Sequence, residues 1–364
     1  MPIAEPIYLD NNATTPLRAE TIAAIQQAMG PPANPSSVHS FGRQARLHVE
    51  DARQALSVLV GCQTQDVVFT SGGTEANNLA LSGFSNVITS AIEHDSILKA
   101  APQASLLPVT GDGVVDLAVL KQIVTMLPAN QREKTIVSVM AANNETGVIQ
   151  PLAEIVEIAR DGGLATHSDM VQMLGKAHID LATLDLDFVS FSAHKIGGPS
   201  GIGALIVRSG MSLTSLLRGG GQEQGRRSGT ENLLGITGFG AAAVAAFGDV
   251  AHHRQMAGWR DDFEVSIGAA RPDVVLFGTG MPRLGNTSCF AIAGKASETL
   301  VMALDIAGFA VSAGSACSSG KVTASHVLTA MGAGEKAAQA IRVSGGWQTR
   351  KEDFDRLAQV VAGL

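Results

Sequence analysis

The chain has 364 residues, of which 45% are hydrophobic and 16% are charged, a balance that supports a large core and excludes a disordered chain. At about 100–200 residues per domain, this length predicts two domains. The net charge of −7 and the aromatic content of 4% argue against a direct nucleic-acid binder and against binding to an anionic membrane.

The cysteines are sparse and odd in number: Cys62, Cys289 and Cys317. Such a set argues against a disulfide framework and for a reducing compartment, and no pair has the spacing of a metal site. The first residues lack the basic and apolar pattern of a signal peptide, and no apolar stretch is long enough to span a bilayer. We therefore expect a cytoplasmic protein without a resident metal.

Short apolar runs alternate along the chain with helix-length amphipathic stretches. The apolar runs predict strands at 67–70, 87–90, 136–141, 165–168, 188–192 and 203–207. The amphipathic stretches predict helices at 19–29, 39–60, 74–82, 117–126 and 151–161, followed by an alanine-rich helical segment at 233–263. This alternation is typical of an α/β domain with a mainly parallel sheet.

We place the domain boundary near His252. Residues 15–252 are expected to form the large α/β domain. Residues 1–14 and 253–364 are expected to form a smaller α+β domain that carries the loop around Cys317. In an open parallel sheet, ligands bind beyond the carboxyl ends of the strands, so the residues that follow each predicted strand are the candidates for a site.

The first predicted strand leads into Ser71-Gly72-Gly73-Thr74 and then into a helix. Small residues let backbone N–H groups approach an anion, and the helix dipole favours negative charge there. The pattern predicts a phosphate site at Gly73 and Thr74. Taken alone, a tight turn with a threonine cap explains it more simply.

Polar residues also follow the next three strands. His94 has the chemistry to stack on a flat cofactor or to shuttle a proton, or it is a capping residue. Asn144 lies in a polar run that also fits an ordinary turn. Asp169, at the end of a buried strand, needs a cationic partner such as a protonated pyridine nitrogen, unless it is a helix N-cap.

Lys195 follows the apolar strand 188–192 and is flanked by Ser192, His194 and glycines. A lysine in a partly desolvated site has a lowered pKa and forms Schiff bases. The run Ser192-x-x-Lys195 also matches a serine acyl-enzyme signature, but the Ser-Asp-Asn and Lys-Thr-Gly motifs that accompany it are missing from the sequence. The residues therefore favour a Schiff-base lysine.

Two further candidates lie near the C-terminal end. Cys317 is surrounded by small polar residues, which predicts an exposed and mobile thiol, whereas Cys289 lies in an apolar strand pattern typical of a core residue. Cys62 follows the end of a predicted helix and has no evident function. Arg342, in an apolar alternation, has the geometry to bind a carboxylate bidentately, with a salt bridge as the alternative.

The order of these motifs resembles that of the NifS/IscS-like cysteine desulfurases, class V aminotransferases among the fold-type I pyridoxal-phosphate enzymes. The resemblance extends from Tyr8 to Arg342. It depends most on three runs: Ser192-Ala193-His194-Lys195, Arg227-Ser228-Gly229-Thr230 and Gly314-Ser315-Ala316-Cys317.

The resemblance implies pyridoxal 5'-phosphate as the cofactor. Lys195 is then the Schiff-base lysine and the base for the substrate's Cα proton, Asp169 the partner of the pyridine nitrogen, and Gln172 the partner of the phenolic oxygen. His94 stacks on the ring and acts as an acid or base. The phosphate binders are Gly73, Thr74, Ser192 and His194, joined by Thr230 across a dimer interface. Asn144 and Arg342 hold the substrate carboxylate, and Asn144 also belongs to the cofactor site.

The implied reaction removes sulfur from L-cysteine, giving L-alanine and a persulfide on Cys317. The loop around Cys317 resembles the group with a longer mobile loop, from which the sulfur passes to an acceptor protein. The acceptor is an iron–sulfur scaffold or a tRNA-thiolation carrier, and Cys317 is also a candidate transient ligand of an iron–sulfur cluster. The enzyme is expected to be a homodimer.

Some positions depart from the family pattern. Met170 and Val171 stand where Ala and a variable residue are common. Gln222 stands where a histidine is frequent, which argues against an acid/base role at that position. The chain ends at Leu364, before the longer tail with which housekeeping members dock a scaffold. A selenocysteine lyase or another class V aminotransferase would share Lys195, Asp169 and His94, and Cys317 favours the desulfurase.

Overall fold

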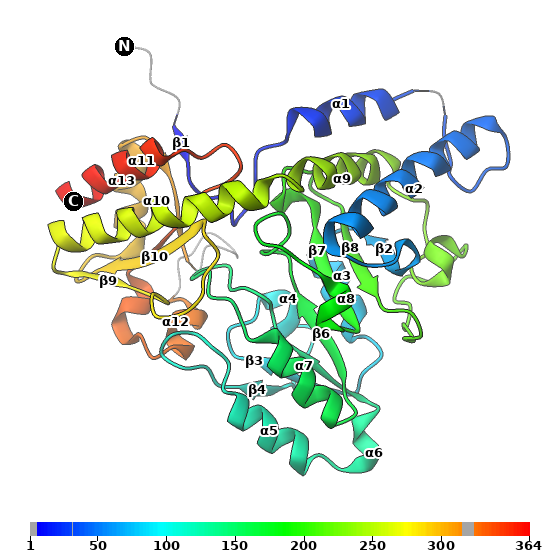
Figure 1. Cartoon of the computed structure of the whole chain (residues 1–364), viewed down its shortest axis with the longest axis horizontal. Helices are drawn as coiled ribbons and strands as arrows, with labels where there is room; N and C mark the ends of the chain where they lie inside the picture. The colour runs from blue at the N-terminus through cyan, green and yellow to red at the C-terminus, as the bar shows by residue number, and fades with distance from the viewer. Residues whose placement is uncertain (1–5, 31, 315–323) are drawn as a thin grey trace.

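The computed structural model describes residues 6–30, 32–314 and 324–364 (Figure 1). Its centre is a seven-stranded sheet with the order β2-β8-β7-β6-β5-β3-β4. The strands are β2 (Val67–Thr70), β3 (Asn86–Ser90), β4 (Ser105–Leu107), β5 (Thr135–Ser138), β6 (Ala165–Asp169), β7 (Phe188–Ser192) and β8 (Gly203–Val207). Strands β4, β3, β5, β6 and β7 are parallel, and only β8 and β2 add antiparallel pairs at one edge, which confirms the predicted mainly parallel sheet.

Helices cover both faces of this sheet because successive strand residues point to opposite sides. In β2, Val67 and Phe69 face one layer, which contains α2 (Ser40–Val60), α5 (Leu117–Met126), α7 (Leu152–Asp161) and α9 (Leu233–Ala246). Val68 faces the other layer, which contains α3 (Gly73–Leu81) and α4 (Asp95–Leu98). Helix α1 (Ala19–Ala28) packs on α9, and α6 (Ala129–Arg132) and α8 (Leu181–Leu184) are short.

Local sequence signals define several helix ends. Helix α2 begins after His39, whose Nδ1 accepts a hydrogen bond from the Gly42 N–H, and it ends at Gly61, where φ is +70°. A left-handed residue of this kind is the usual C-terminal cap, and glycine adopts it at no steric cost. Helix α5 begins after Asp116, whose carboxylate accepts from the N–H groups of Ala118 and Val119.

A second, antiparallel sheet has the order β12-β13-β10-β9. Its strands are β9 (Val274–Leu276), β10 (Thr287–Ile292), β12 (Ser312–Ala313) and β13 (Ala340–Ser344). Helices α10 (Asp249–Ala270), α11 (Ser297–Ile306) and α13 (Lys351–Gly363) pack on one face, and α12 (His326–Ala330) packs on the other. Strand β1 (Ile7–Tyr8) pairs in parallel with β11 (Phe309–Ala310), so the N-terminal stretch packs against the C-terminal third.

The predicted strands 67–70, 188–192 and 203–207 agree with the structure residue for residue. The predicted strand 136–141 was too long, because β5 ends at Ser138. The helical segment 233–263 is divided into α9 and α10, and α10 extends to Ala270. The domain boundary at 252 stays a prediction, and that position lies within α10 (Figure 1).

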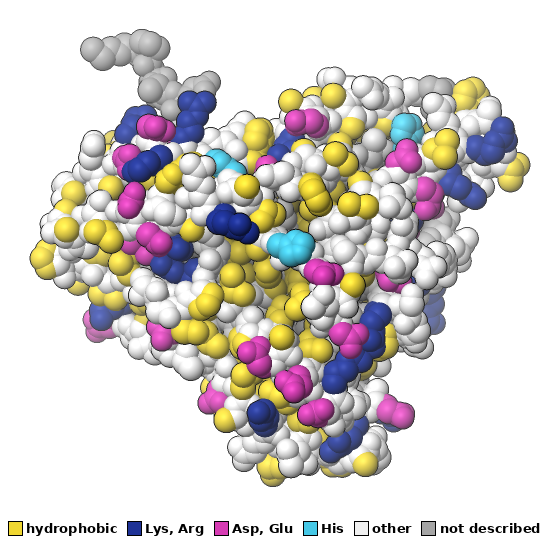
Figure 2. Space-filling model, in the orientation of Figure 1, with side chains coloured by type: hydrophobic (Ala, Val, Ile, Leu, Met, Phe, Trp, Pro, Cys, Tyr) yellow, Lys and Arg dark blue, Asp and Glu magenta, His cyan; other side chains and the backbone are white. Residues whose placement is uncertain are grey.

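No single described helix is long and apolar enough to cross a membrane, and α9 and α10 pass that test only as a pair bent by 62°. Figure 2 shows acidic and basic side chains interspersed over one face of the molecule. That distribution agrees with the modest net charge of −7.

Candidate active site

A cavity of about 280 Å³ lies beyond the carboxyl ends of β5, β6 and β7 and beside the start of α3. Polar backbone and side-chain groups converge there because parallel strands bring their carboxyl ends to one edge. The predicted site residues that line it are Gly73, Thr74, His94, Asn144, Asp169, Gln172, Ser192, His194 and Lys195.

Lys195 lies in a 3₁₀ turn directly after β7 and is partly buried. Its Nζ donates to the backbone carbonyl oxygens of Asn12, at 2.5 Å, and Ala13, at 2.7 Å. The N-terminal segment therefore holds the lysine amine in the wall of the cavity.

Asp169 is joined to His94 by a chain of hydrogen bonds. Asn77 Nδ2 donates to Asp169 Oδ2 at 2.7 Å and to Ser96 Oγ at 2.8 Å. The Ser96 hydroxyl lies 2.8 Å from His94 Nδ1, which also accepts from the Ser96 N–H. Because Nδ1 accepts, a neutral His94 ring carries its proton on Nε2.

His94 and Asp169 also have the capping roles that the sequence analysis gave as alternatives to a role in the site. His94 is the N-cap of α4, and Asp169 Oδ1 accepts from the Val171 N–H at 3.0 Å, which orders the turn after β6. Asp169 is nevertheless only 8% exposed and faces the cavity, and no Lys, Arg or His side chain pairs with it among the described residues. A carboxylate in that position is suited to a cationic ligand.

The turn between β2 and α3 brings backbone close to the cavity. A Cβ atom added at Gly73 would lie 3.0 Å from Val171 Cγ2 and 3.6 Å from Ser192 Cβ, so glycine is the residue that fits there. The N-cap of α3 is Gly72, which has no side chain to cap the first N–H groups. These groups and the helix dipole form an anion site at this end of the cavity.

His194 lies at the same end, where its Nδ1 is 3.2 Å from Thr14 Oγ1. Burial lowers the pKa of His194 to about 4, with smaller contributions from the positive charges of Lys195 and Lys176. The ring is therefore neutral at pH 7, and it offers one N–H donor and one acceptor.

Arg342, on β13, does not line the cavity but lies behind Asn144. Its Nη2 forms a 2.6 Å ion pair with Asp10, and its Nη1 donates to the Asn144 carbonyl at 3.3 Å. Arg342 is 2% exposed, and its Nε has no partner among the described residues. The salt bridge weighed from the sequence is thus present.

Like Arg342, Thr230 is a predicted site residue that does not line this cavity. Thr230 is exposed on the loop before α9. Cys317 lies outside the described residues. The residues that flank its segment lie beside Glu145, the neighbour of Asn144: Ser325 Oγ donates to Glu145 Oε2 at 2.6 Å, and a Cβ atom at Gly314 would collide with the same oxygen.

Two residues that the sequence did not single out connect the site. Asn12 lies opposite the end of β7, and Lys176 follows Gln172 by four positions in a run of turns. Lys176 Nζ donates to Asn12 Oδ1 at 2.8 Å and to Gln172 Oε1 at 2.9 Å. The available sequence signal was a lysine within the mostly apolar run Met173-Leu174-Gly175-Lys176.

The two described cysteines are poor nucleophiles. Burial, with a smaller contribution from Asp66, raises the pKa of Cys62 to about 12. Cys289 is fully buried in β10, and burial raises its pKa far above the ordinary value. The prediction that Cys289 is a core residue is confirmed.

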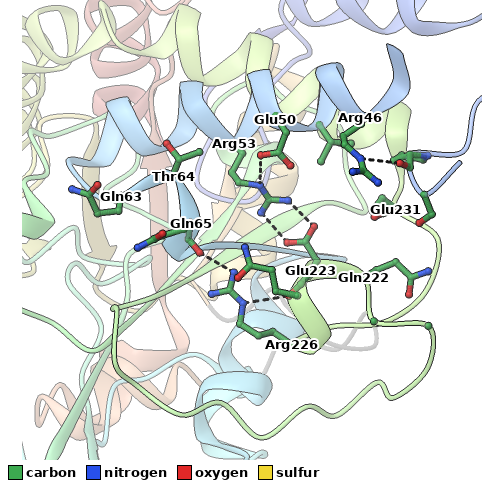
Figure 3. A pocket seen from close by; sticks show the side chains of 16 residues that line it. Arg46, Glu50, Arg53, Gln63, Thr64, Gln65, Gln222, Glu223, Arg226 and Glu231 are labelled. Carbon is green, nitrogen blue, oxygen red and sulfur yellow. Dashed lines mark hydrogen bonds and ion pairs between the residues drawn. The ribbon is translucent and has the colours of Figure 1, made fainter. Parts of the chain in front are cut away.

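A larger cavity of about 670 Å³ lies between α2 and the loop that contains Gln222 (Figure 3). Two of its charged side chains pair with each other: Arg53 and Glu223 form two hydrogen bonds of 2.9 Å, and both are buried. Gln222 Oε1 accepts from the Gly229 N–H at 3.0 Å, so this side chain orders the glycine-rich loop. Of the residues that line this larger cavity, none was predicted to be part of the site.

Residues 7–357 match the aminotransferase class-V family model. The chain is 37% identical over 373 residues to the cysteine desulfurase IscS of Dictyoglomus turgidum, covering 98% of this chain and 93% of that protein. It is 38% identical over 378 residues to a cysteine desulfurase of Cereibacter sphaeroides, with 98% and 95% covered. The crystal structure of a NifS-like protein from Rickettsia africae superposes with a TM-score of 0.90 at 35% identity, covering 98% of both chains.

Proposed function

The chain belongs to the cysteine desulfurases of the class V aminotransferase family, and we propose that it removes sulfur from L-cysteine with pyridoxal phosphate at Lys195 and with Cys317 as the sulfur acceptor. The family is pyridoxal-phosphate dependent and has the fold-type I architecture seen here. One observation carries the proposal: a single cavity is lined by Lys195, Asp169 and His94, three groups that this cofactor requires.

The cavity fits the cofactor in charge as well as in shape. The dianionic phosphate is matched by the uncapped start of α3 and by the close backbone approach at Gly73. Thr74, Ser192 and His194 add hydrogen-bond groups at that end. Asp169, which has no cationic partner among the described side chains, is matched to the protonated ring nitrogen.

Pyridoxal phosphate, when bound, supplies an electron sink for the electrons released at the substrate's Cα. Asp169 sustains that property by keeping the ring nitrogen protonated, and Asn77 holds the carboxylate in place. Gln172 would hold the phenolic oxygen, and the His94 ring would pack against the bound cofactor. These are the roles that the family pattern assigns to these positions.

Lys195 would hold the cofactor through its amine, and the free Nζ would accept the substrate's Cα proton. The carbonyl oxygens of Asn12 and Ala13 orient the amine for both tasks. His94 carries its proton on Nε2 in the neutral ring, so that atom would donate a hydrogen bond to the substrate.

Asn144 and Arg342 hold the substrate carboxylate. Arg342 is buried beside Asn144, with its Nε unpaired among the described residues, and the substrate competes with Asp10 for the guanidinium. A guanidinium has five N–H donors, which suits a carboxylate that must be held in one orientation.

The Cys317 thiolate attacks the substrate's sulfur. An S–S bond forms on Cys317 as the C–S bond breaks, and the electron pair of that bond stays with Cβ, which takes up a proton. The proton held by Lys195 returns to Cα, and alanine leaves. The persulfide then passes its sulfur to an acceptor protein.

A second copy of the chain completes the phosphate site in this proposal. Thr230 is exposed and outside the cavity of its own chain, as expected for a residue that contacts the cofactor of a partner. An iron–sulfur scaffold or a tRNA-thiolation carrier receives the sulfur. Selenocysteine, with its more easily broken C–Se bond, is an expected second substrate.

The test compares the native enzyme with Cys317→Ala and Lys195→Ala. The visible spectrum reports the lysine-bound cofactor, and sulfide and alanine release from L-cysteine with a thiol reductant reports turnover. We expect native and Cys317→Ala proteins to show the visible band, Lys195→Ala to lack it, and only the native enzyme to release equal amounts of sulfide and alanine.

Cys62→Ala is the matched control, because its thiol is remote from the cavity and is expected to leave turnover unchanged. Full activity in Cys317→Ala would contradict the proposal. It would assign the enzyme to the lyases or aminotransferases that share Lys195, Asp169 and His94.

A further inference from the structure

Lys176 is a buried lysine beside the cavity, 6% exposed, with no carboxylate partner in the described part of the chain. Burial, followed by the positive charges of Lys195 and Arg342, holds the pKa of Lys176 well below its usual range. The amine donates to the two oxygens within reach, Asn12 Oδ1 at 2.8 Å and Gln172 Oε1 at 2.9 Å.

These contacts determine which way the Gln172 amide points. Gln172 Nε2 donates to the backbone carbonyl of Asn12 at 3.1 Å, and a carbonyl oxygen can only accept. The amide nitrogen must therefore lie on that side, which leaves Oε1 facing Lys176. The second N–H of the amide has no acceptor among the described residues, and Gln172 lines the cavity.

The Asn12 side chain is fixed by the same amine. Its Oδ1 accepts from Lys176 and from Asn286 Nδ2, and its Nδ2 donates to the Asn144 carbonyl and to Thr287 Oγ1. The backbone carbonyl of Asn12 binds Lys195. Lys176 therefore contacts two side chains, each of which touches another group of the proposed site.

We propose that Lys176 is a positioning residue that holds the Gln172 amide with its remaining N–H directed at the phenolic oxygen of pyridoxal phosphate. The proposal rests on the proposed function, because it assigns Gln172 to that oxygen. Without Lys176 only the Asn12 carbonyl orients the amide, and the turned amide, which presents its own oxygen to the phenolic oxygen, becomes more populated. Two acceptors would then face each other without a proton between them, which disfavours the bound cofactor.

Lys176→Met tests the proposal, because methionine has a similar length and no N–H donor. The apoprotein is titrated with pyridoxal phosphate, and the visible band of the lysine-bound cofactor is recorded. We expect the dissociation constant to rise about 3- to 10-fold, as for the loss of one hydrogen bond, and the band maximum to shift. Lys121→Met, at an exposed position on α5, is the matched control and should change neither.

A double-mutant cycle separates positioning from general damage. In a Gln172→Leu background there is no amide to orient, so adding Lys176→Met should change the dissociation constant and the band by less than about twofold. Thermal unfolding of each apoprotein checks that it is folded. Lys176→Leu replaces the methionine variant if the latter does not fold.

Unchanged affinity and an unchanged band in folded Lys176→Met would overturn the inference and leave the proposed function intact. Equal losses in the native and Gln172→Leu backgrounds would also overturn it, because they would assign Lys176 a structural role only. Absence of the visible band in the native protein would overturn the proposed function, and the inference with it.

Discussion

Asn12 and Glu93 show how single buried residues control the candidate site. Asn12 uses its backbone carbonyl for Lys195 and its side chain for Lys176, Asn286 and Thr287. Glu93, next to His94, is fully buried: its Oε1 accepts from Ser90 Oγ and from the Met140 N–H. Its Oε2 has no partner within the described part of the molecule.

The Glu93 carboxyl makes the stability of the apoprotein depend on pH. Burial raises the pKa of Glu93 from 4.5 to about 8. Between those two values the folded state binds the proton and the unfolded state does not, so stability falls as pH rises from 4.5 to 8 and is constant above. We expect Glu93→Gln to remove this fall, which amounts to a few kcal/mol.

The measurement is thermal unfolding of the native and Glu93→Gln apoproteins at pH 5 and pH 8. These two pH values span most of the range between the pKa of Glu93 in the unfolded protein and its pKa in the folded protein. Glu157→Gln, at an exposed position of α7, is the control and should follow the native protein at both pH values. A difference between Glu93→Gln and native protein that is the same at both pH values would show that Glu93 titrates normally.

At the scale of elements, one ion pair ties helix α2 to the glycine-rich loop. Figure 3 shows the Arg53–Glu223 pair. Arg53 on α2 also donates to the Val67 carbonyl at 2.6 Å, and Glu223 Oε2 accepts from the Phe69 N–H at 3.0 Å. Glu223 and Gln224 have φ values of +48° and +59°. Non-glycine residues adopt such values only when surrounding contacts hold them there, and the ion pair supplies those contacts.

Glu223→Ala should therefore destabilise the protein by up to about 3–5 kcal/mol, because it leaves the buried Arg53 charge with only the exposed Glu50 as an ion-pair partner, at 3.3 Å. The Phe69 N–H also loses its acceptor. The measurement is urea-induced unfolding of the apoprotein. Arg53→Leu combined with Glu223→Leu should lose less than Glu223→Ala, since no charge is then left unpaired, and a greater loss in the double variant would refute this account.

At the scale of the whole molecule, the proposed cofactor site depends on a second copy. We expect the holoenzyme to sediment as a dimer at micromolar concentration. Thr230→Ala should weaken cofactor binding about 3- to 10-fold, as expected for the loss of one hydrogen bond to phosphate. A monomer with the cofactor bound at full affinity would show that Thr230 has no such contact.

The sequence was sufficient to predict the large sheet and most of the cavity. Strands β2, β7 and β8 were predicted to the residue because each is a short apolar run between turn signals. Nine predicted residues line one cavity because parallel strands present their carboxyl ends at one edge. The break between α9 and α10 was missed, because alanine-rich sequence supports a helix on either side of it.

The sequence by itself determined the order of the motifs along the chain, the family, and the residues that face the cavity. These depend on local pattern and on the chemistry of each side chain. Only the tertiary structure decided how those residues are held. Asn12 and Lys176 are separated by more than a third of the chain and meet at 2.8 Å, and Arg342 reaches Asp10 from the opposite end. Such pairings arise from packing between distant segments, for which no local pattern in the sequence carries a signal.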